Sequence, residues 1–289
     1  MPVHPVVTGF FDEPTNTVSY VVADLETGAG AIVDSVLDYD TASGHTSTQS
    51  AGLLIAHVQK HGLKLDWILE THVHADHLSA APYIQEKLGG TLAIGENIRA
   101  VQETFGKIFN AGTEFERDGS QFDRLFKDGE TFMLGRIPGH VMHTPGHTPA
   151  CLTYVIGDAA FIGDTLFMPD FGTARADFPG GDARQLYGSI RRLLSLPPET
   201  RLFLCHDYKA PGRDHFAWET TVAAERANNV HVKDGISEDE FVVMRIARDK
   251  TLGTPKLIIP SIQVNMNAGH FPAPETDGNV YLKVPVNRI

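Results

Sequence analysis

The sequence predicts a single α/β domain whose chemistry lies along one edge. Short apolar runs alternate with amphipathic segments in both halves of the chain, and each half begins with strand-like runs. Polar clusters follow directly after apolar runs, most clearly after residues 67–70 and 160–162. Sites in layered α/β proteins gather in loops at strand ends, because the sheet and its helices fix the positions of those loops.

The first half of the chain is expected to contain a β-hairpin followed by alternating helices and strands. Runs rich in β-branched and apolar residues predict strands at 18–23, 31–33, 67–70 and 91–94. Apolar residues at helical spacing, with glycines as stop signals, predict helices at 51–61, 79–88 and 97–109. The polar stretches are expected to be loops at 34–50 and 111–120.

In the second half, short strands with tight turns come first and helices follow. Strands are expected at 132–134, 137–141, 152–156, 160–162 and 201–204. Helices are expected at 183–196, 216–229 and 237–250. The tail from Thr254 is rich in Pro, Asn and Gly and contains one strand-like run, 280–284.

Composition excludes several classes of protein. The 289 residues include 42% hydrophobic and 21% charged residues, which is ordinary for a globular chain. A formal charge of −12 without basic clusters argues against a nucleic-acid partner. With two cysteines, no secretory signal and no bilayer-spanning stretch in view, we expect a cytoplasmic protein with no membrane partner.

The strongest chemical signal is the motif H-x-H-x-D-H directly after the predicted strand 67–70. It contains His72, His74, Asp76 and His77. Three imidazoles and one carboxylate within six residues cannot share one face of a regular helix or strand, but on a loop they can converge on one point. Imidazole and carboxylate are usual ligands of zinc and of non-haem iron. The motif therefore predicts a metal site.

Three weaker signals also sit at turns or strand ends. His147 follows a Pro-Gly turn, Asp164 follows the predicted strand 160–162, and His206 follows the predicted strand 201–204. Alone, Asp164 would be read as a turn residue and His206 as an ordinary loop histidine. Because all of these signals share the same structural position, together they strengthen the prediction of one metal site.

The order H-x-H-x-D-H, P-G-H-T, G-D and H-D-Y resembles the metallo-β-lactamase superfamily. The motifs span residues 71–208, and the strand pattern extends the resemblance to the N-terminus. The resemblance implies an αβ/βα sandwich, in which two central mixed sheets are flanked by helices. It also implies a metallo-β-lactamase-like catalytic core at 1–230 and a C-terminal extension, 231–289, packed on the same domain.

The ligands alone leave two metal arrangements open. The seven candidates are His72, His74, Asp76, His77, His147, Asp164 and His206. If all seven bind, two metals share Asp164 and activate a hydroxide for hydrolysis. If only His72, His147 and Asp164 bind, they form a facial triad on a single iron, which leaves positions open for a substrate and for O2.

Flanking stretches favour the single iron through a second resemblance. They resemble the persulfide dioxygenases, in particular the bacterial β-lactamase-like hydrolase group, which is related to glyoxalase II. These stretches are 38–50, 174–178, 185–190, 206–209 and 259–267. The longer helical C-terminal domain with which glyoxalase II holds its glutathione thioester is not seen in the sequence.

The resemblance implies that the protein oxidises glutathione persulfide with O2 to sulfite and glutathione, a reaction of sulfide detoxification. His72, His147 and Asp164 would be the catalytic residues and would hold one Fe(II) per chain. The other four ligand candidates would support them or form a second metal site. A homo-oligomer, dimer or tetramer, is expected. The alternative is a glyoxalase II-like thioester hydrolase with two Zn, and a scaffold without catalysis is a third class.

Two residues are candidates for binding the substrate. Arg175 can make a bidentate contact with a carboxylate, and Tyr187 can donate a hydrogen bond. Each also has a structural interpretation, an ion pair with Asp177 or a packed tyrosine. Asp34 has no histidine at a defined spacing, so a Ser-His-Asp hydrolase gains no support. Cys205, although it precedes His206, is expected to be a buried apolar side chain.

Overall fold

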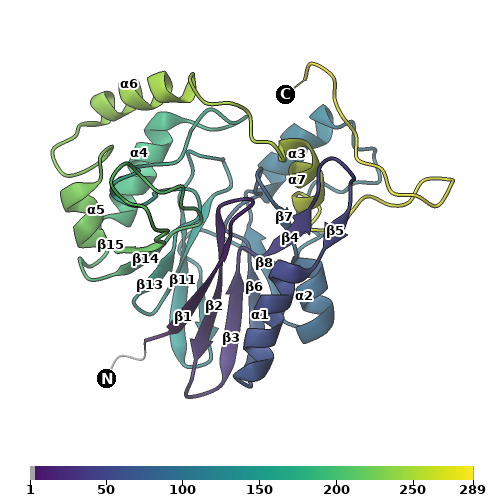
Figure 1. Ribbon diagram of the computed structural model, residues 1–289, viewed down its shortest axis with the longest axis horizontal. Helices are drawn as coiled ribbons and strands as arrows, with labels where there is room; N and C mark the ends of the chain where they lie inside the picture. The colour runs from purple at the N-terminus through teal and green to yellow at the C-terminus, as the bar shows by residue number, and fades with distance from the viewer. Residues whose placement is uncertain (1–3, 289) are drawn as a thin grey trace.

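The computed structural model describes residues 4–288 and has the αβ/βα arrangement of two central mixed sheets (Figure 1). The first sheet has the order β1-β2-β3-β6-β8-β9, with its β3, β6, β8 and β9 parallel. Its strands are β1 (Val6–Asp12), β2 (Thr17–Asp24), β3 (Ala29–Val33), β6 (Lys64–Leu69), β8 (Thr91–Gly95) and β9 (Arg124–Phe126).

The second sheet follows the chain in the order β10-β11-β12-β13-β14-β15, and β13 and β14 are its parallel pair. Its strands are β10 (Thr131–Leu134), β11 (Ile137–His143), β12 (Leu152–Ile156), β13 (Ala159–Phe161), β14 (Arg201–Phe203) and β15 (Glu219–Thr221). A small third sheet consists of β5 (Thr46–Ser47), β4 (Val36–Tyr39) and β7 (Leu78–Ser79).

Helices cover the outer face of each large sheet (Figure 1). The first sheet packs against α1 (Gln49–Lys60), α2 (Ala81–Leu88), α3 (Ile98–Ile108) and α7 (Ile258–Asn265). The second sheet packs against α4 (Ala183–Leu193), α5 (Val222–Asn228) and α6 (Glu238–Asp249). Within residues 4–288, no helix combines the length and apolarity needed to cross a bilayer.

The main core lies between the two large sheets and is rich in aromatic side chains. Phe126 packs against Phe132 with ring centroids 5.3 Å apart, and Phe161 stacks on Phe203 at 5.2 Å. Strand β2 is buried along its whole length because alternate side chains face different layers. Its Val21 belongs to the core under α1, whereas its even-numbered neighbours face the second sheet.

The structure corrects three of the predicted segments. The run 216–229 is not one helix: β15 comes first and α5 follows, since the β-branched Thr220 and Thr221 pair with β14 and Thr221 caps α5. The tail run 280–284 forms no strand, whereas α7 appears where the sequence predicted only a tail. The predicted loop 34–50 contains β4 and β5.

The strand ends meet where the sequence analysis expected the chemistry. Parallel strands place their carboxyl ends at one edge, so the segments after β3 and β6 are neighbours, as are those after β13 and β14. The two sheets face each other, and this brings all four segments together at one end of the sandwich.

Candidate metal centre

The structure brings all seven predicted ligand side chains to this end of the sandwich. The loop after β6 carries His72, His74, Asp76 and His77, and the remaining three follow β11, β13 and β14. The ligand atoms of His72, His147 and Asp164 all lie within 4.8 Å of one another. A second group with the same spacing contains His74, Asp76 and His77.

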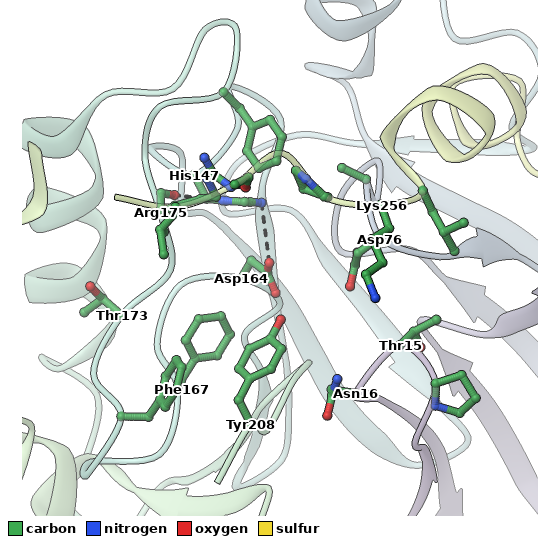
Figure 2. Close-up of a pocket in the computed structure, with 18 of the residues that line it drawn as sticks. Thr15, Asn16, Asp76, His147, Asp164, Phe167, Thr173, Arg175, Tyr208 and Lys256 are labelled. Atoms are coloured by element: carbon green, nitrogen blue, oxygen red, sulfur yellow. Dashed lines mark hydrogen bonds and ion pairs between the residues drawn. The ribbon is translucent and has the colours of Figure 1, made fainter. Parts of the chain in front are cut away.

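Asp164 lies between two parts of the site. Its Oδ2 is 3.4 Å from His147 Nε2 (Figure 2), and its Oδ1 is 3.3 Å from His206 Nε2. His206 Nε2 is in turn 3.1 Å from Asp76 Oδ2. Asp164 therefore has the placement of a carboxylate that one metal can share with a second.

Hydrogen bonds fix which nitrogen of the ligand histidines carries the proton. His147 Nδ1 donates to the carbonyl of Arg175 at 2.8 Å, and His206 Nδ1 donates to the carbonyl of Asn16 at 3.2 Å. A carbonyl only accepts, so Nδ1 of each ring must be protonated. The Nε2 lone pair of both rings is left for a metal ion.

The histidines of the β6 loop are held in the same way. The Thr71 hydroxyl donates to Asp34 Oδ2 at 2.8 Å and therefore accepts from His72 Nδ1 at 3.0 Å. His74 uses its other nitrogen, Nε2, to donate to Asp34 Oδ1 at 3.0 Å. His77 Nδ1 lies 3.3 Å from the Thr17 hydroxyl.

The opposite atoms of these side chains provide the test of whether a metal fits. Within residues 4–288, six buried ligand atoms have no hydrogen-bond partner: His72 Nε2, His74 Nδ1, Asp76 Oδ2, His77 Nε2, Asp164 Oδ1 and His206 Nε2. An unsatisfied buried polar atom costs about 1–3 kcal/mol, so a native structure rarely gathers several without a use. Coordination of metal ions would engage all of them, and the donor set suits zinc or non-haem iron.

Electrostatics keeps two of these groups, His72 and Asp76, in the form that binds a cation. Burial, reinforced by the neighbouring His74 and His147, lowers the pKa of His72 well below its usual value, so this imidazole is neutral. Burial alone would raise the pKa of Asp76, but the nearby His206 and His77 outweigh it and hold that pKa below its usual range. Asp76 is therefore ionised.

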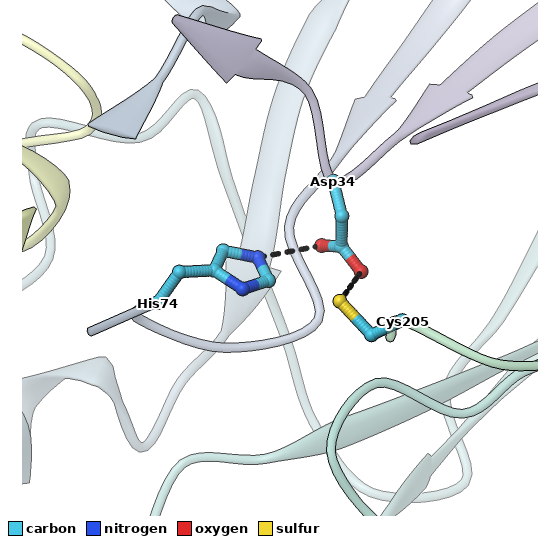
Figure 3. Close-up of side chains that lie close together, drawn as sticks. All are labelled: Asp34, His74 and Cys205. Carbon is cyan, nitrogen blue, oxygen red and sulfur yellow. Dashed lines mark hydrogen bonds and ion pairs between the residues drawn. The ribbon is translucent and has the colours of Figure 1, made fainter. Parts of the chain in front are cut away.

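Asp34 is a site residue that the sequence analysis missed: no histidine lies at a defined spacing from it in the sequence, but the fold pairs it with His74 (Figure 3). It is buried at a positive φ of 49° directly after β3, and besides His74 it accepts from the Thr71 N–H at 2.8 Å. Burial alone would raise its pKa, but His74 outweighs burial and lowers it. Its position after an apolar strand is the signal that could have found it.

The comparison with known families now decides the family. The sequence profile of the metallo-beta-lactamase superfamily matches residues 12–206, which include every candidate ligand. The chain belongs to this superfamily. The profile covers both large sheets as far as β14, and so the end of the sandwich that carries the ligands lies within the matched region.

Curated superfamily members with high sequence identity have hydrolase-like names. The chain is 57% identical to a probable metallo-hydrolase of Burkholderia pseudomallei, over 98% of this chain and 99% of that one. It is 47% identical to glyoxylase B2 of Dictyostelium discoideum, over 94% and 93%. Other relatives are longer: the chain spans 65% of the beta-lactamase hydrolase-like protein of Xylella fastidiosa, at 52% identity.

More distant members have a different activity in their names. The human mitochondrial persulfide dioxygenase ETHE1 is 28% identical over 92% of this chain and 89% of its own. The crystal structure of ETHE1 from Myxococcus xanthus superposes with a TM-score of 0.73 at 28% identity, over 92% of this chain and all of that one.

A cavity of about 690 Å³ opens onto the metal centre (Figure 2). Asp76, His147 and Asp164 lie at its base. Its walls come from the β1–β2 turn, from the β4–β5 turn, from the loop after β13 and from the chain between α6 and α7. The wall side chains include Phe167, Tyr208, Arg175, Arg245, Arg248 and Lys256.

The structure treats the two predicted substrate contacts differently. Arg175 lines the cavity, but its guanidinium is paired with Asp177 at 2.6 and 2.9 Å and donates to the Gly253 carbonyl at 2.7 Å. Tyr187 is not among the residues lining the cavity: its hydroxyl donates to the Ile236 carbonyl at 2.8 Å, because α4 turns this side chain toward α6. Cys205 is buried, as expected.

Arg248 and Lys256 are cavity residues that sequence reasoning missed. Both are exposed, and within the part of the chain that the structure describes neither forms an ion pair with a carboxylate. Arg248 instead lies over the Phe171 ring, 5.8 Å from its centroid. No motif marks these positions, because only the packing of α6 and the following chain brings them to the cavity.

Proposed function

We propose that this protein is a persulfide dioxygenase, which oxidises glutathione persulfide with O2 at one Fe(II) per chain. The proposal rests on the convergence of His72, His147 and Asp164, of which His147 and Asp164 line a cavity, in a chain similar to ETHE1 over most of its length. One persulfide, one O2 and one water give glutathione, sulfite and protons. Detoxification of sulfide, a cytoplasmic location and a homo-oligomeric state belong to the same proposal.

The residues of this site have different roles in that reaction: some would hold the metal, some orient the metal-binding rings and some hold a proton. Fe(II), when bound, would supply coordination positions for a persulfide sulfur and for O2, so that proximity lowers the barrier. Arg175, through its carbonyl, and Thr71, through its hydroxyl, hold the rings of His147 and His72 in place. Asp76 Oδ2 and His206 Nε2, 3.1 Å apart, can hold the proton released by the persulfide.

The cavity supports an anionic substrate such as a glutathione derivative. The protein as a whole is acidic, with a formal charge of −12, yet Arg248 and Lys256 present positive charge at the cavity wall. Glutathione has two carboxylates, and a cation that is not already paired can bind a carboxylate at a lower cost than the engaged Arg175. We propose Arg248 and Lys256 as the carboxylate-binding residues.

Oxygen uptake and metal analysis test the proposal together. Protein produced with ample iron is expected to hold about one Fe per chain. It should consume O2 with glutathione persulfide, produce sulfite and leave glutathione unchanged. Two tightly bound Zn per chain, with no O2 uptake on any persulfide, would overturn the proposal.

The second candidate is a binuclear thioester hydrolase of the glyoxalase II kind. The similarity to glyoxylase B2 and the convergence of all seven ligands favour it. Hydrolysis by two metals requires Asp76 and His77, whereas the iron triad does not include them. Asp76→Ala and His77→Ala should therefore abolish thioester hydrolysis if this candidate is correct, while a dioxygenase would keep its iron.

A further inference from the structure

We infer that the C-terminal extension, residues 231–289, positions the metal-binding loops. The inference rests on the proposed metal centre and is independent of the reaction performed there. The superfamily profile ends at residue 206, so α6 and α7 lie outside the matched region. Both helices nevertheless place a buried polar side chain on a loop connected to the ligands.

A buried ion pair on helix α6 makes hydrogen bonds to the backbone of the loop that follows Asp164. Arg245 Nη2 lies 2.6 Å from Asp249 Oδ1, and the two side chains are 1% and 6% exposed. Arg245 Nη1 also donates to the Thr173 carbonyl at 3.0 Å. Asp249 Oδ2 accepts the Ala176 N–H at 3.0 Å. The pair therefore binds the backbone on both sides of residues 174–175.

The contacts from α6 are linked to the candidate ligand His147 by one backbone carbonyl, that of Arg175. Arg175 lies between the two gripped positions, and its carbonyl accepts from His147 Nδ1 at 2.8 Å. Two more contacts from the extension hold the same loop: His231 Nδ1 accepts the Thr173 N–H at 3.1 Å, and the Gly253 carbonyl accepts from the Arg175 side chain at 2.7 Å. A shift of this loop would release the His147 ring from the orientation that aims Nε2 at Asp164.

Helix α7 holds the other ligand loop. Asn265 is 5% exposed, and its Nδ2 donates to the carbonyls of His74 at 2.9 Å and His77 at 2.8 Å. Its Oδ1 accepts the Ser79 N–H at 2.8 Å. One amide thus satisfies three backbone groups of the segment that carries His74, Asp76 and His77.

Stability alone does not account for the ion pair on α6. Replacing a buried ion pair by apolar side chains is often neutral or stabilising, because removing two charges from water is costly. A buried ion pair is therefore weak evidence of added stability, whereas this pair fixes two backbone groups next to a candidate ligand. Arg245 and Asp249 are therefore positioning residues, as is Asn265.

Metal binding by the apoprotein tests the inference directly. In Asp249→Asn, an NH2 group replaces one of the two oxygens that accept separately from Arg245 and from Ala176, so one of these contacts is lost. Asn265→Leu removes the two donors to the β6 loop. Titration with Co²⁺ should show an affinity about 10–100-fold lower than wild type and altered visible absorption bands of the bound ion. Glu238→Gln is the matched control, since this α6 carboxylate pairs with Arg184 at the surface.

The outcomes distinguish a role in positioning the metal-binding loops from a role in stability alone, and they are independent of the proposed dioxygenase reaction. Thermal unfolding of each apoprotein is measured beside the titration. Lower thermal stability with wild-type Co²⁺ affinity and spectrum would overturn the inference, and a variant that does not fold is replaced by Arg245→Lys or Asn265→Gln. Since Co²⁺ binding needs neither iron nor persulfide, a wild-type protein without O2 uptake would refute the dioxygenase and leave this inference standing.

Discussion

The base and the wall of the cavity are built in opposite ways. The base comprises the seven candidate ligand side chains, three of which (Asp76, His147 and Asp164) line the cavity while the other four lie behind them. All are buried except the partly exposed Asp76, and the histidines are oriented by neighbouring polar groups. The wall presents Arg248 and Lys256, which are exposed and lack carboxylate partners within residues 4–288. The side chains of the base are therefore held in position before a ligand binds, whereas the wall carries positive charges that a bound anion can neutralise.

This difference indicates how one superfamily can include both hydrolases and oxygenases. The base offers the same atoms to one metal or to two, so its residues do not determine the reaction by themselves. The wall comes partly from the chain beyond residue 206, which includes the extension and which the superfamily profile does not match. Selection of the substrate is therefore expected to depend on the wall, and metal retention on the base.

The largest effect is expected from removing the carboxylate at the centre of the base. Asp164→Ala deletes the group that lies between His147 and His206. Turnover should fall at least about 1,000-fold, which corresponds to about 4 kcal/mol of barrier, and the bound metal should be lost on dialysis. Metal analysis and O2 uptake measure both effects. Asp158→Asn, at a surface ion pair with Arg201, is the control, and retention of metal in Asp164→Ala would contradict the assignment.

A smaller loss of metal affinity is expected when Asp34, which supports the candidate ligands without being one of them, is changed. Asp34 accepts four hydrogen bonds, two from Thr71, one from His74 and one from the Cys205 thiol, and an amide offers only one acceptor oxygen. Asp34→Asn should lower Zn²⁺ affinity about 10–100-fold, as measured by competition with a chelator. An unchanged affinity would show that the β6 loop keeps its shape without this carboxylate.

The regular elements followed from local patterns, and the misses came from tertiary contacts. Strand β6 and helix α3 were predicted because the spacing of their apolar residues is evident in the sequence. Strand β15 was taken for the start of a helix, since three residues pairing with β14 leave little local signal. Helix α7 was missed in a segment with prolines on either side, where packing against the first sheet outweighs local preference.

The convergence of the candidate ligands was predictable from the sequence, whereas the residues that support them were not. His72 to His77 form a dense motif, whereas Asp34 meets His74 only because parallel β3 and β6 place their ends side by side. Tyr187 was predicted to donate a hydrogen bond to the substrate, but the orientation of α4 removes it from the cavity. Tyr208, which was not predicted as a substrate contact, lines the cavity instead. The hydrogen bonds of Asn265 to the β6 loop form only because the fold brings residues 188 and 191 positions apart together, so no pattern in the sequence predicts them.

Changes at the wall should affect binding and spare the metal. Lys256→Ala and Arg248→Ala are each expected to raise the KM for glutathione persulfide about 5-fold, because contacts of exposed charges are weak, and to leave kcat within about 2-fold. The increase should shrink at high salt. Steady-state O2 uptake measures both constants. Lys250→Ala, an exposed cation at the end of α6 that does not line the cavity, is the control. A fall in kcat with metal loss would place these residues in the base.

The smallest effect concerns a buried acid that belongs to neither region. Glu225 on α5 accepts from Asn229 at 2.6 Å, and Asn229 donates to the Gly172 carbonyl at 3.0 Å, behind the loop that α6 grips. Burial raises the pKa of Glu225 to about 8 from the ordinary 4.5. Between these values the folded state binds the extra proton, so stability falls as pH rises through this window.

Glu225→Gln removes that pH dependence, because an amide does not ionise while its oxygen still accepts from Asn229. Relative to wild type, the variant should gain about 5 °C in Tm between pH 5.5 and pH 8.5, which thermal unfolding at the two values measures. Glu199→Gln, at an exposed carboxylate, should show no such gain. Metal content and KM should not change, since Glu225 contacts neither a ligand nor the cavity. If metal content or KM does change, the contact of Asn229 with the loop at Gly172 also affects the metal centre, and the base and the wall are not independent.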